Sequence, residues 1–152
     1  MKVLLATDGT KYSDAATDMA AKLQLQAGDE VKVVCVVDMA VPLAIDIYGG
    51  YIPETTEIEK AARENAERIV RGTMDSLKAR LGDQNANLSS EVLFGSPDSR
   101  IVETAEENGT DLVVIGSHGY NAWERLLLGS VSNSVAQHAP CSVLVVRLKR
   151  ET

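Results

Sequence analysis

The stretch Asp111–Ser132, DLVVIGSHGYNAWERLLLGSVS, combines an apolar run, a set of spaced glycines and the start of a helix-like segment. The run Leu112–Ile115 ends in a glycine, which is typical of a buried strand that stops at a loop. Gly116, Gly119 and Gly129 fall in the pattern Gly-x2-Gly-x9-Gly-Ser. Glycines let a ligand approach the backbone closely, because they carry no Cβ. The free N–H groups and positive dipole end of a following helix attract anions, so the stretch predicts phosphate binding.

Two familiar phosphate-binding motifs do not fit this pattern. The sequence has no Gly-Lys-Ser/Thr, as a Walker loop requires, and no dinucleotide fingerprint Gly-x-Gly-x-x-Gly. The hydroxyls of Ser130 and Ser132 lie where the last helix is expected to begin. They could cap that helix, contact a phosphate, or do both in one geometry.

The remainder of the chain alternates between strand-like and helix-like patterns. Apolar segments at 2–6, 31–37, 88–94 and 142–148 predict four further strands, and segments with helical spacing lie between them. This order predicts an α/β fold with one doubly wound, open sheet of five parallel strands and helices on both faces. The length, 152 residues, suits a single domain over 1–152.

Several element boundaries can be predicted from individual residues. Ser13 is expected to cap the first helix and Gly28 to end it. The longest helix should begin at Thr55 or Thr56 and run to about Leu81, with Ile58 on its apolar face. Residues 38–53 lose all periodicity, which is typical of a long functional or mobile connection.

Ligands of such open sheets bind beyond the carboxyl ends of the strands, where the winding reverses. Two loops carry suitable chemistry: residues 7–10 after the first strand, and residues 116–119 after the fourth. They meet in one crevice if the strand order is 3-2-1-4-5, which we therefore predict. Asp8 could cap its own turn, hydrogen-bond a ribose, or contact a phosphate-bound Mg²⁺ through water. His118 could be an exposed loop residue, or contribute mainly its backbone N–H.

Composition narrows the class of protein. The net charge is −7, from 15 basic and 22 acidic residues, and no dense basic run is present, so nucleic-acid binding is not expected. No apolar run reaches the roughly 18 residues of a membrane span, and no secretory signal is recognisable, so we expect a cytoplasmic protein. Cys35 and Cys141 form no Cys-x-x-Cys pair and are expected to be buried small apolar residues rather than metal ligands.

At residues 111–132 the chain resembles the universal stress protein family, in its ATP-binding subclass. The nucleotide motif of that family is Gly-x2-Gly-x9-Gly-(Ser/Thr), and Gly116, Gly119, Gly129 and Ser130 fill it without a gap. The segments VLLATDGT, IGSHG, LLLGSVS and PCSVLVV are also similar, so the resemblance spans essentially the whole chain. It implies a fold of the adenine nucleotide alpha-hydrolase-like (HUP) type.

The resemblance also implies a ligand, a site and an assembly. The ligand would be ATP, or ADP or AMP, with Mg²⁺, and two copies would pair through their last strands. Asp8 would lie at the nucleotide, and the backbone of Val36 would hydrogen-bond the adenine edge. The full set of implied binding residues is Ala6, Thr7, Asp8, Val36, Ile115, Gly116, Ser117, His118, Gly119, Gly129, Ser130, Val131 and Ser132.

Two functions are compatible with such a site, and a third fits poorly. The first is a regulatory protein in which ATP favours one conformation, assembly or unidentified protein partner. The second is a slow ATPase, or a protein that phosphorylates itself on Ser130 or Ser132. Efficient phosphoryl transfer needs concentrated positive charge, and the motif offers only His118 and Arg125. A response-regulator or flavin module fits poorly, because Asp8 stands alone after the first strand and aromatic residues are 4% of the chain. No catalytic residue or protein-bound metal site is assigned.

Overall fold

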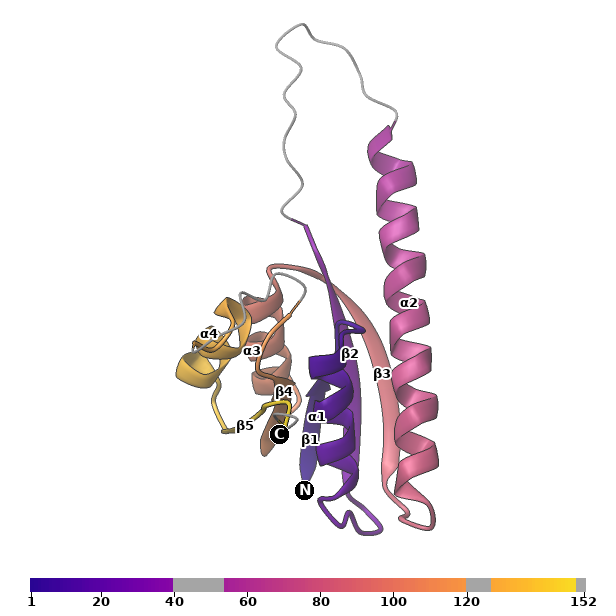
Figure 1. Cartoon of the computed structure of the whole chain (residues 1–152), viewed down its shortest axis with the longest axis vertical. Coiled ribbons are helices and arrows are strands. Elements are labelled where there is room, and N and C mark those ends of the chain that lie inside the picture. The colour runs from indigo at the N-terminus through magenta and orange to yellow at the C-terminus, as the bar shows by residue number, and fades with distance from the viewer. Residues whose placement is uncertain (40–53, 120–126, 150–152) are drawn as a thin grey trace, which may run out of the picture.

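The computed structural model of the chain describes residues 1–39, 54–119 and 127–149. Within these residues five strands alternate with four helices (Figure 1). The strands are β1 (Lys2–Ala6), β2 (Glu30–Asp38), β3 (Asn87–Gly95), β4 (Leu112–Gly116) and β5 (Ser142–Val146). The helices are α1 (Lys11–Ala21), α2 (Glu54–Leu81), α3 (Pro97–Glu107) and α4 (Ser130–His138). The predicted alternation of strands and helices is therefore confirmed.

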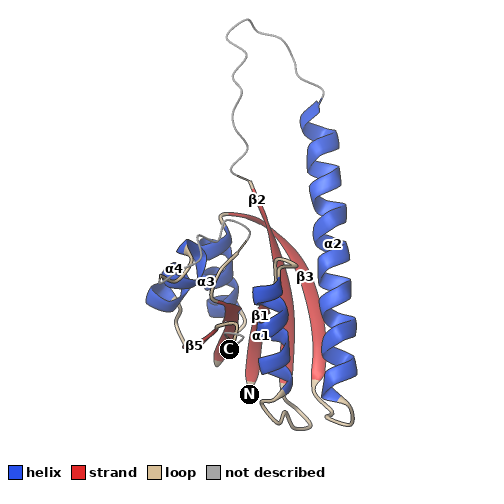
Figure 2. Cartoon of the chain, viewed as in Figure 1, coloured by secondary structure: helices blue, strands red, loops and turns tan. Residues whose placement is uncertain are grey.

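All neighbouring strands are parallel, and their order is β3-β2-β1-β4-β5, as predicted (Figure 2). The central pair is β1 with β4, in the register Val3↔Leu112 and Leu5↔Val114. The winding reverses between these two strands. Their carboxyl ends carry the loops 7–10 and 116–119, which consequently lie side by side at one edge of the sheet.

Both faces of the sheet are buried at its central strands β1, β2 and β4, which explains why these strands are nearly continuously apolar. Successive side chains of a strand point to opposite faces. Val3 and Leu5 of β1 accordingly pack in one cluster with residues of α1 and α2, whereas Leu4 and Ala6 pack in a second with residues of α3 and α4. Figure 1 shows the two pairs of helices on either side of the sheet.

The ends of α1 differ from the prediction. The N-cap is Thr10, whose side chain accepts a hydrogen bond from the Ser13 backbone N–H, so Ser13 is already inside the helix. The helix ends at Ala21 with Lys22 as its C-cap, and Gly28, at φ +95°, belongs to the later turn. The predicted N-cap, Ser13, is wrong because Thr10 and Ser13 are both good capping residues, and the local sequence does not distinguish between them.

The long helix α2 has the predicted length, but its first turns pack differently from the prediction. Leu77 and Leu81 are buried, whereas Ile58 is 65% exposed. Figure 1 shows the reason: the N-terminal part of α2 extends past the end of the sheet. Most of the predicted connection 38–53 lies outside the described residues. No described helix combines the length and apolar character needed to cross a membrane.

Gly116 is required by packing between β4 and α1. A Cβ on this residue would lie 2.7 Å from both the carbonyl carbon and the oxygen of Tyr12, which are backbone atoms at the start of α1. The sequence suggested that this glycine makes room for a ligand. The structure shows that it makes room for a helix.

We predict that Gly116→Ala destabilises the fold by about 1–3 kcal/mol, because the backbone of α1 must move to accept a methyl group. Urea denaturation would measure the free energy of unfolding. Gly72→Ala is the matched control, since a Cβ there meets nothing within 4 Å and the residue lies inside α2. The control should be as stable as the wild type or slightly more stable. Equal stability of Gly116→Ala and the wild type would refute this packing role.

Candidate functional site

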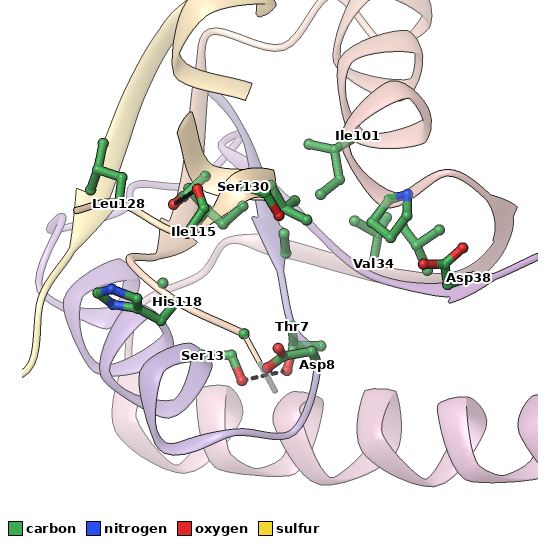
Figure 3. Close-up of a pocket in the computed structure, with 18 of the residues that line it drawn as sticks. Thr7, Asp8, Ser13, Val34, Asp38, Ile101, Ile115, His118, Leu128 and Ser130 are labelled. Atoms are coloured by element: carbon green, nitrogen blue, oxygen red, sulfur yellow. Dashed lines mark hydrogen bonds between the residues drawn. The ribbon is translucent and has the colours of Figure 1, made fainter. Parts of the chain in front are cut away.

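A cavity of about 640 Å³ opens at the carboxyl ends of β1, β2 and β4. Its size falls in the range of small-molecule sites, about 300–1,000 Å³. Figure 3 shows that Asp8 and His118 come from the loops after β1 and β4, while Val34 and Asp38 come from β2. The lining residues are Ala6, Thr7, Asp8, Ser13, Val34, Val36, Asp38, Pro97, Ile101, Ile115, Gly116, His118, Gly119, Leu127, Leu128, Gly129, Ser130, Val131 and Ser132.

The cavity brings together all of the predicted site residues except Ser117. Ser117 is buried behind the wall, where its backbone N–H donates to the Val146 carbonyl at 2.8 Å. Its carbonyl accepts from the Gly129 N–H at 2.8 Å and from Ser132 Oγ at 2.9 Å. Ser117 thus joins the end of β4 to the start of α4, and its contribution to the site is structural.

The other two motif glycines also permit close approaches within the chain. A Cβ on Gly129 would lie 3.2 Å from both the Ser117 oxygen and the Cα of His118. A Cβ on Gly119 would lie 3.0 Å from Oδ2 of Asp8, which is the end of a side chain rather than backbone. Gly129 therefore serves the packing of the wall. Gly119 faces the cavity and the Asp8 carboxylate, so it is the position where a larger side chain would fill ligand space.

The start of α4 supplies the positive end of a dipole to this cavity. Its N-cap is Gly129, so Ser130 is the first helical residue rather than the cap that was one of its predicted roles. No side chain caps the helix, and its first turn contains no acidic residue. In contrast, α1 and α3 each have an aspartate in the first turn. The first N–H groups of a helix have no intrahelical acceptor, so those of α4 can bind an anion.

Ser132 has a role that its sequence position did not reveal. Its hydroxyl donates to the carbonyls of Ser117, at 2.9 Å, and Gly129, at 3.0 Å, and the residue is buried. These bonds tie the first turn of α4 to the end of β4. The single hydroxyl proton is already shared between two carbonyl oxygens, so Ser132 stabilises the wall of the cavity.

Asp8 adopts the turn-capping role that was one of its alternatives. Its Oδ1 accepts from the Thr10 backbone N–H at 3.0 Å and from Thr10 Oγ1 at 2.6 Å. Oδ2 faces Gly119. Asp38 adds a second carboxylate to the lining, whereas no lysine or arginine lines the cavity among the described residues. The proposed cation Arg125 lies outside them. The described lining is therefore acidic, apart from the helix dipole.

Buried hydroxyls hold the loop after β1 to α1 and α2. Thr73 Oγ1 of α2 lies 3.0 Å from Thr7 Oγ1, which donates to Ser13 Oγ at 3.2 Å. Ser13 Oγ donates in turn to the Thr10 carbonyl at 2.9 Å. Since the Thr7 proton is used by Ser13, Thr73 must be the donor to Thr7. The chain of bonds is complete, so the Thr7 hydroxyl has no proton left for a ligand.

The Cys35 thiol, which lies near this loop, is protonated at neutral pH. Burial raises the pKa of Cys35 to about 11, and the negative charge of Asp8 adds to the effect. The thiolate is the nucleophilic form, so Cys35 is unreactive at neutral pH, as its prediction as a buried apolar residue implies. Cys141 is only half-buried, which corrects the corresponding prediction for that residue.

Sequence reasoning missed seven lining residues: Ser13, Val34, Asp38, Pro97, Ile101, Leu127 and Leu128. Period-2 alternation along β2 could have found Val34 and Asp38, because both share a strand face with the predicted Val36. The remaining five come from helices or their flanks. Their positions depend on how α1, α3 and α4 pack against the sheet, and no local sequence pattern predicts that packing.

Comparisons with known proteins agree with this architecture. The model of the Universal stress protein family matches residues 1–147. A Staphylococcus haemolyticus protein named as a universal stress protein is 32% identical over 146 residues, which cover 95% of this chain and 83% of the relative. Universal stress protein YxiE of Bacillus subtilis is 30% identical over 149 residues, which cover 96% of this chain and 98% of the relative.

Solved structures show the same fold. Universal stress protein UspA from Lactobacillus plantarum superposes with a TM-score of 0.70 at 24% identity, over 97% of each chain. A universal stress protein solved in complex with cAMP has a TM-score of 0.65 and 25% identity, over 97% of this chain and 96% of that one. The family match over nearly all residues and the shared sheet order lead to one conclusion: the chain belongs to the universal stress protein family.

Proposed function

We propose that this protein binds an adenine nucleotide in the cavity between β1, β4 and α4, and that the bound nucleotide regulates its conformation or partners in the stress response. The observation that carries the proposal is the uncapped N-terminus of α4, which opens into a cavity of about 640 Å³ next to Gly119. A member of the family was solved in complex with cAMP. That relative supports nucleotide binding here, because it shares the fold and 25% of its residues.

The two ends of the cavity suit the two ends of a nucleotide. Val34 and Ile101 lie on one side of the cavity in Figure 3, with the Asp38 carboxylate beside Val34. Their apolar side chains suit a purine base, since ligand sites combine apolar walls with a few polar groups. Ser130 and Gly119 lie at the polar end, where helix N–H groups favour phosphate. In Figure 3, Ser130 lies between His118 on one side and Val34 and Ile101 on the other.

The acidic lining bears on how a triphosphate would be held. Asp8 Oδ2 faces Gly119, so a phosphate chain reaching this glycine would approach a carboxylate. A Mg²⁺ ion carried by the phosphates would offset that repulsion, with Asp8 as a direct or water-mediated ligand. The described residues contain no cluster of three ligating side chains that would hold a metal without the nucleotide. The residues therefore fit a metal delivered as a nucleotide complex.

The site supports regulation better than catalysis. Among the described lining residues no lysine or arginine is present to stabilise a transferring phosphoryl group. Ser132, one candidate for self-phosphorylation, has its hydroxyl engaged by two carbonyls. We also propose that two copies associate through β5, which pairs only with β4 among the described strands and has half-buried Val143, Leu144 and Val145.

Nucleotide binding can be tested by calorimetry with ATP, AMP and cAMP, with and without Mg²⁺. We expect at least one of them to bind the wild type, and Gly119→Val to lose that binding, because the new side chain fills the space beside Asp8. The fold should survive, since Gly119 does not have a positive φ and the nearest atom is a side-chain oxygen. Gly72→Val, at an open position in α2, is the matched control. Unchanged affinity in Gly119→Val would refute this placement of the ligand.

The role of the α4 start can be tested with Ser130→Ala. We expect nucleotide binding to weaken by about 1 kcal/mol or more, the scale of a hydrogen bond to a charged group. Ser130 follows the N-cap, so its loss should leave the helix intact. Ser90→Ala, on the exposed part of β3, is the control and should bind like the wild type. Identical dissociation constants for wild type and Ser130→Ala would argue against phosphate contact by this hydroxyl.

The enzyme alternative predicts turnover of Mg²⁺-ATP. We expect phosphate release to stay well below about 1 per second, the lower end of typical enzyme rates, because the described lining lacks cationic side chains. A coupled phosphate assay on freshly purified protein would measure it. A rate within the usual enzyme range would favour the ATPase.

A further inference from the structure

His118 lies between Gly116, the last residue of β4, and Gly119, and it contacts the chain again at Leu127, just before α4. Its Nε2 lies 2.7 Å from the carbonyl oxygen of Leu127, nine residues later in the chain. Its Nδ1 lies 2.9 Å from Ser117 Oγ. The ring also packs on Tyr12 of α1, with ring centroids 5.1 Å apart. The imidazole therefore contacts the start of α1, the end of β4 and the approach to α4.

The partners of the ring determine which nitrogen carries the proton. A carbonyl oxygen only accepts, so Nε2 must be the donor to Leu127. In the neutral ring Nδ1 then accepts the proton of the Ser117 hydroxyl. Both nitrogens are thereby engaged within the chain. Although His118 lines the cavity, neither nitrogen is left to contact a ligand in this arrangement.

The Leu127 carbonyl is well placed to control the ligand site. Leu127 directly precedes Leu128, Gly129 and Ser130, which line the cavity and lead into α4. The Leu127 side chain is 81% exposed, so packing of that side chain does little to hold the segment. The bond from Nε2 supplements the bond from the Gly129 N–H to the Ser117 carbonyl. Together these two bonds join residues 127 and 129 to residues 118 and 117.

We propose that His118 is a positioning residue for the nucleotide site. Its Nε2–H bond to the Leu127 carbonyl holds the segment before α4 against the end of β4, so that the first N–H groups of α4 are in place before the ligand arrives. Preorganisation of this kind raises affinity by lowering the ordering cost of binding. The inference deepens the proposed nucleotide function and rests on it.

Three substitutions separate this role from direct ligand contact. His118→Gln places an amide N–H where Nε2 was, and so can still donate to Leu127. His118→Asn keeps a polar group near the Nδ1 position but is too short to reach Leu127. His118→Phe keeps a ring for packing on Tyr12 and removes both nitrogens. Thermal unfolding of each variant would confirm that it folds, and His118→Asn replaces His118→Phe as the test if His118→Phe does not fold.

The first measurement is nucleotide affinity by calorimetry, with whichever of ATP, AMP and cAMP binds the wild type. We expect His118→Phe and His118→Asn to bind about three- to tenfold more weakly, the effect of one lost hydrogen bond. His118→Gln should bind within about twofold of the wild type. A merely structural role for the ring would not be rescued by His118→Gln, which has no ring.

The second measurement needs no nucleotide. Amide hydrogen exchange at Gly129, whose N–H donates to the Ser117 carbonyl, should be faster in His118→Phe and His118→Asn than in the wild type and in His118→Gln. Nitrogen NMR of the wild type should show His118 protonated at Nε2. If the wild type binds none of the three nucleotides, the proposed function fails, while these readouts still test the bond itself.

Two outcomes would overturn the inference. One is that His118→Phe and His118→Asn match the wild type in both affinity and Gly129 exchange, because the bond would then hold nothing in place. The other is that His118→Gln protects Gly129 as well as the wild type does but binds nucleotide as weakly as His118→Phe. In that case the imidazole would contact the nucleotide itself.

Discussion

The pairing of β1 with β4 is the constraint on which the site depends. These strands are distant in sequence, yet they are hydrogen-bonded neighbours at the centre of the sheet, with Val3 opposite Leu112. Because the strands are parallel, the loops that follow them emerge at the same edge. Asp8 consequently faces Gly119 across the mouth of the cavity. Because Gly116 has no Cβ, the backbone at the start of α1 packs directly against the end of β4. This contact forms one wall of the crevice.

The electrostatics of the site are local rather than global. The chain has a net charge of −7, and two carboxylates, Asp8 and Asp38, line the cavity. Long-range attraction of an anion is therefore unfavourable, and binding must rely on directed N–H groups at short range. The start of α4 provides them because a glycine, rather than a capping side chain, precedes Ser130. A helix end left without a side-chain cap suits a ligand that completes it.

Polar side chains around the cavity chiefly hold its walls in place. Thr7 and Ser13 share one chain of hydroxyl bonds with α2, and Ser132 bonds two carbonyls at the start of α4. His118 bonds Ser117 and Leu127. With these side chains engaged, the backbone N–H groups at the start of α4 and the Ser130 hydroxyl are the donors proposed for phosphate. Gly116 and Gly129 are small because a Cβ on either residue would press on backbone atoms of the neighbouring wall.

The alternation of strands and helices, the strand limits to within a few residues, and twelve of the lining residues could be predicted from the sequence. The strands and helices follow from local patterns, namely apolar runs and spaced glycines. The full set of twelve lining residues follows from the family resemblance. Tertiary packing shows that Thr10 rather than Ser13 caps α1, and that Gly116 makes room for a helix as well as lining the cavity. It also decided that His118 bonds Leu127. The reason is physical: each of these depends on which atoms long-range packing brings within 3–4 Å, and spacing along a chain does not encode that distance.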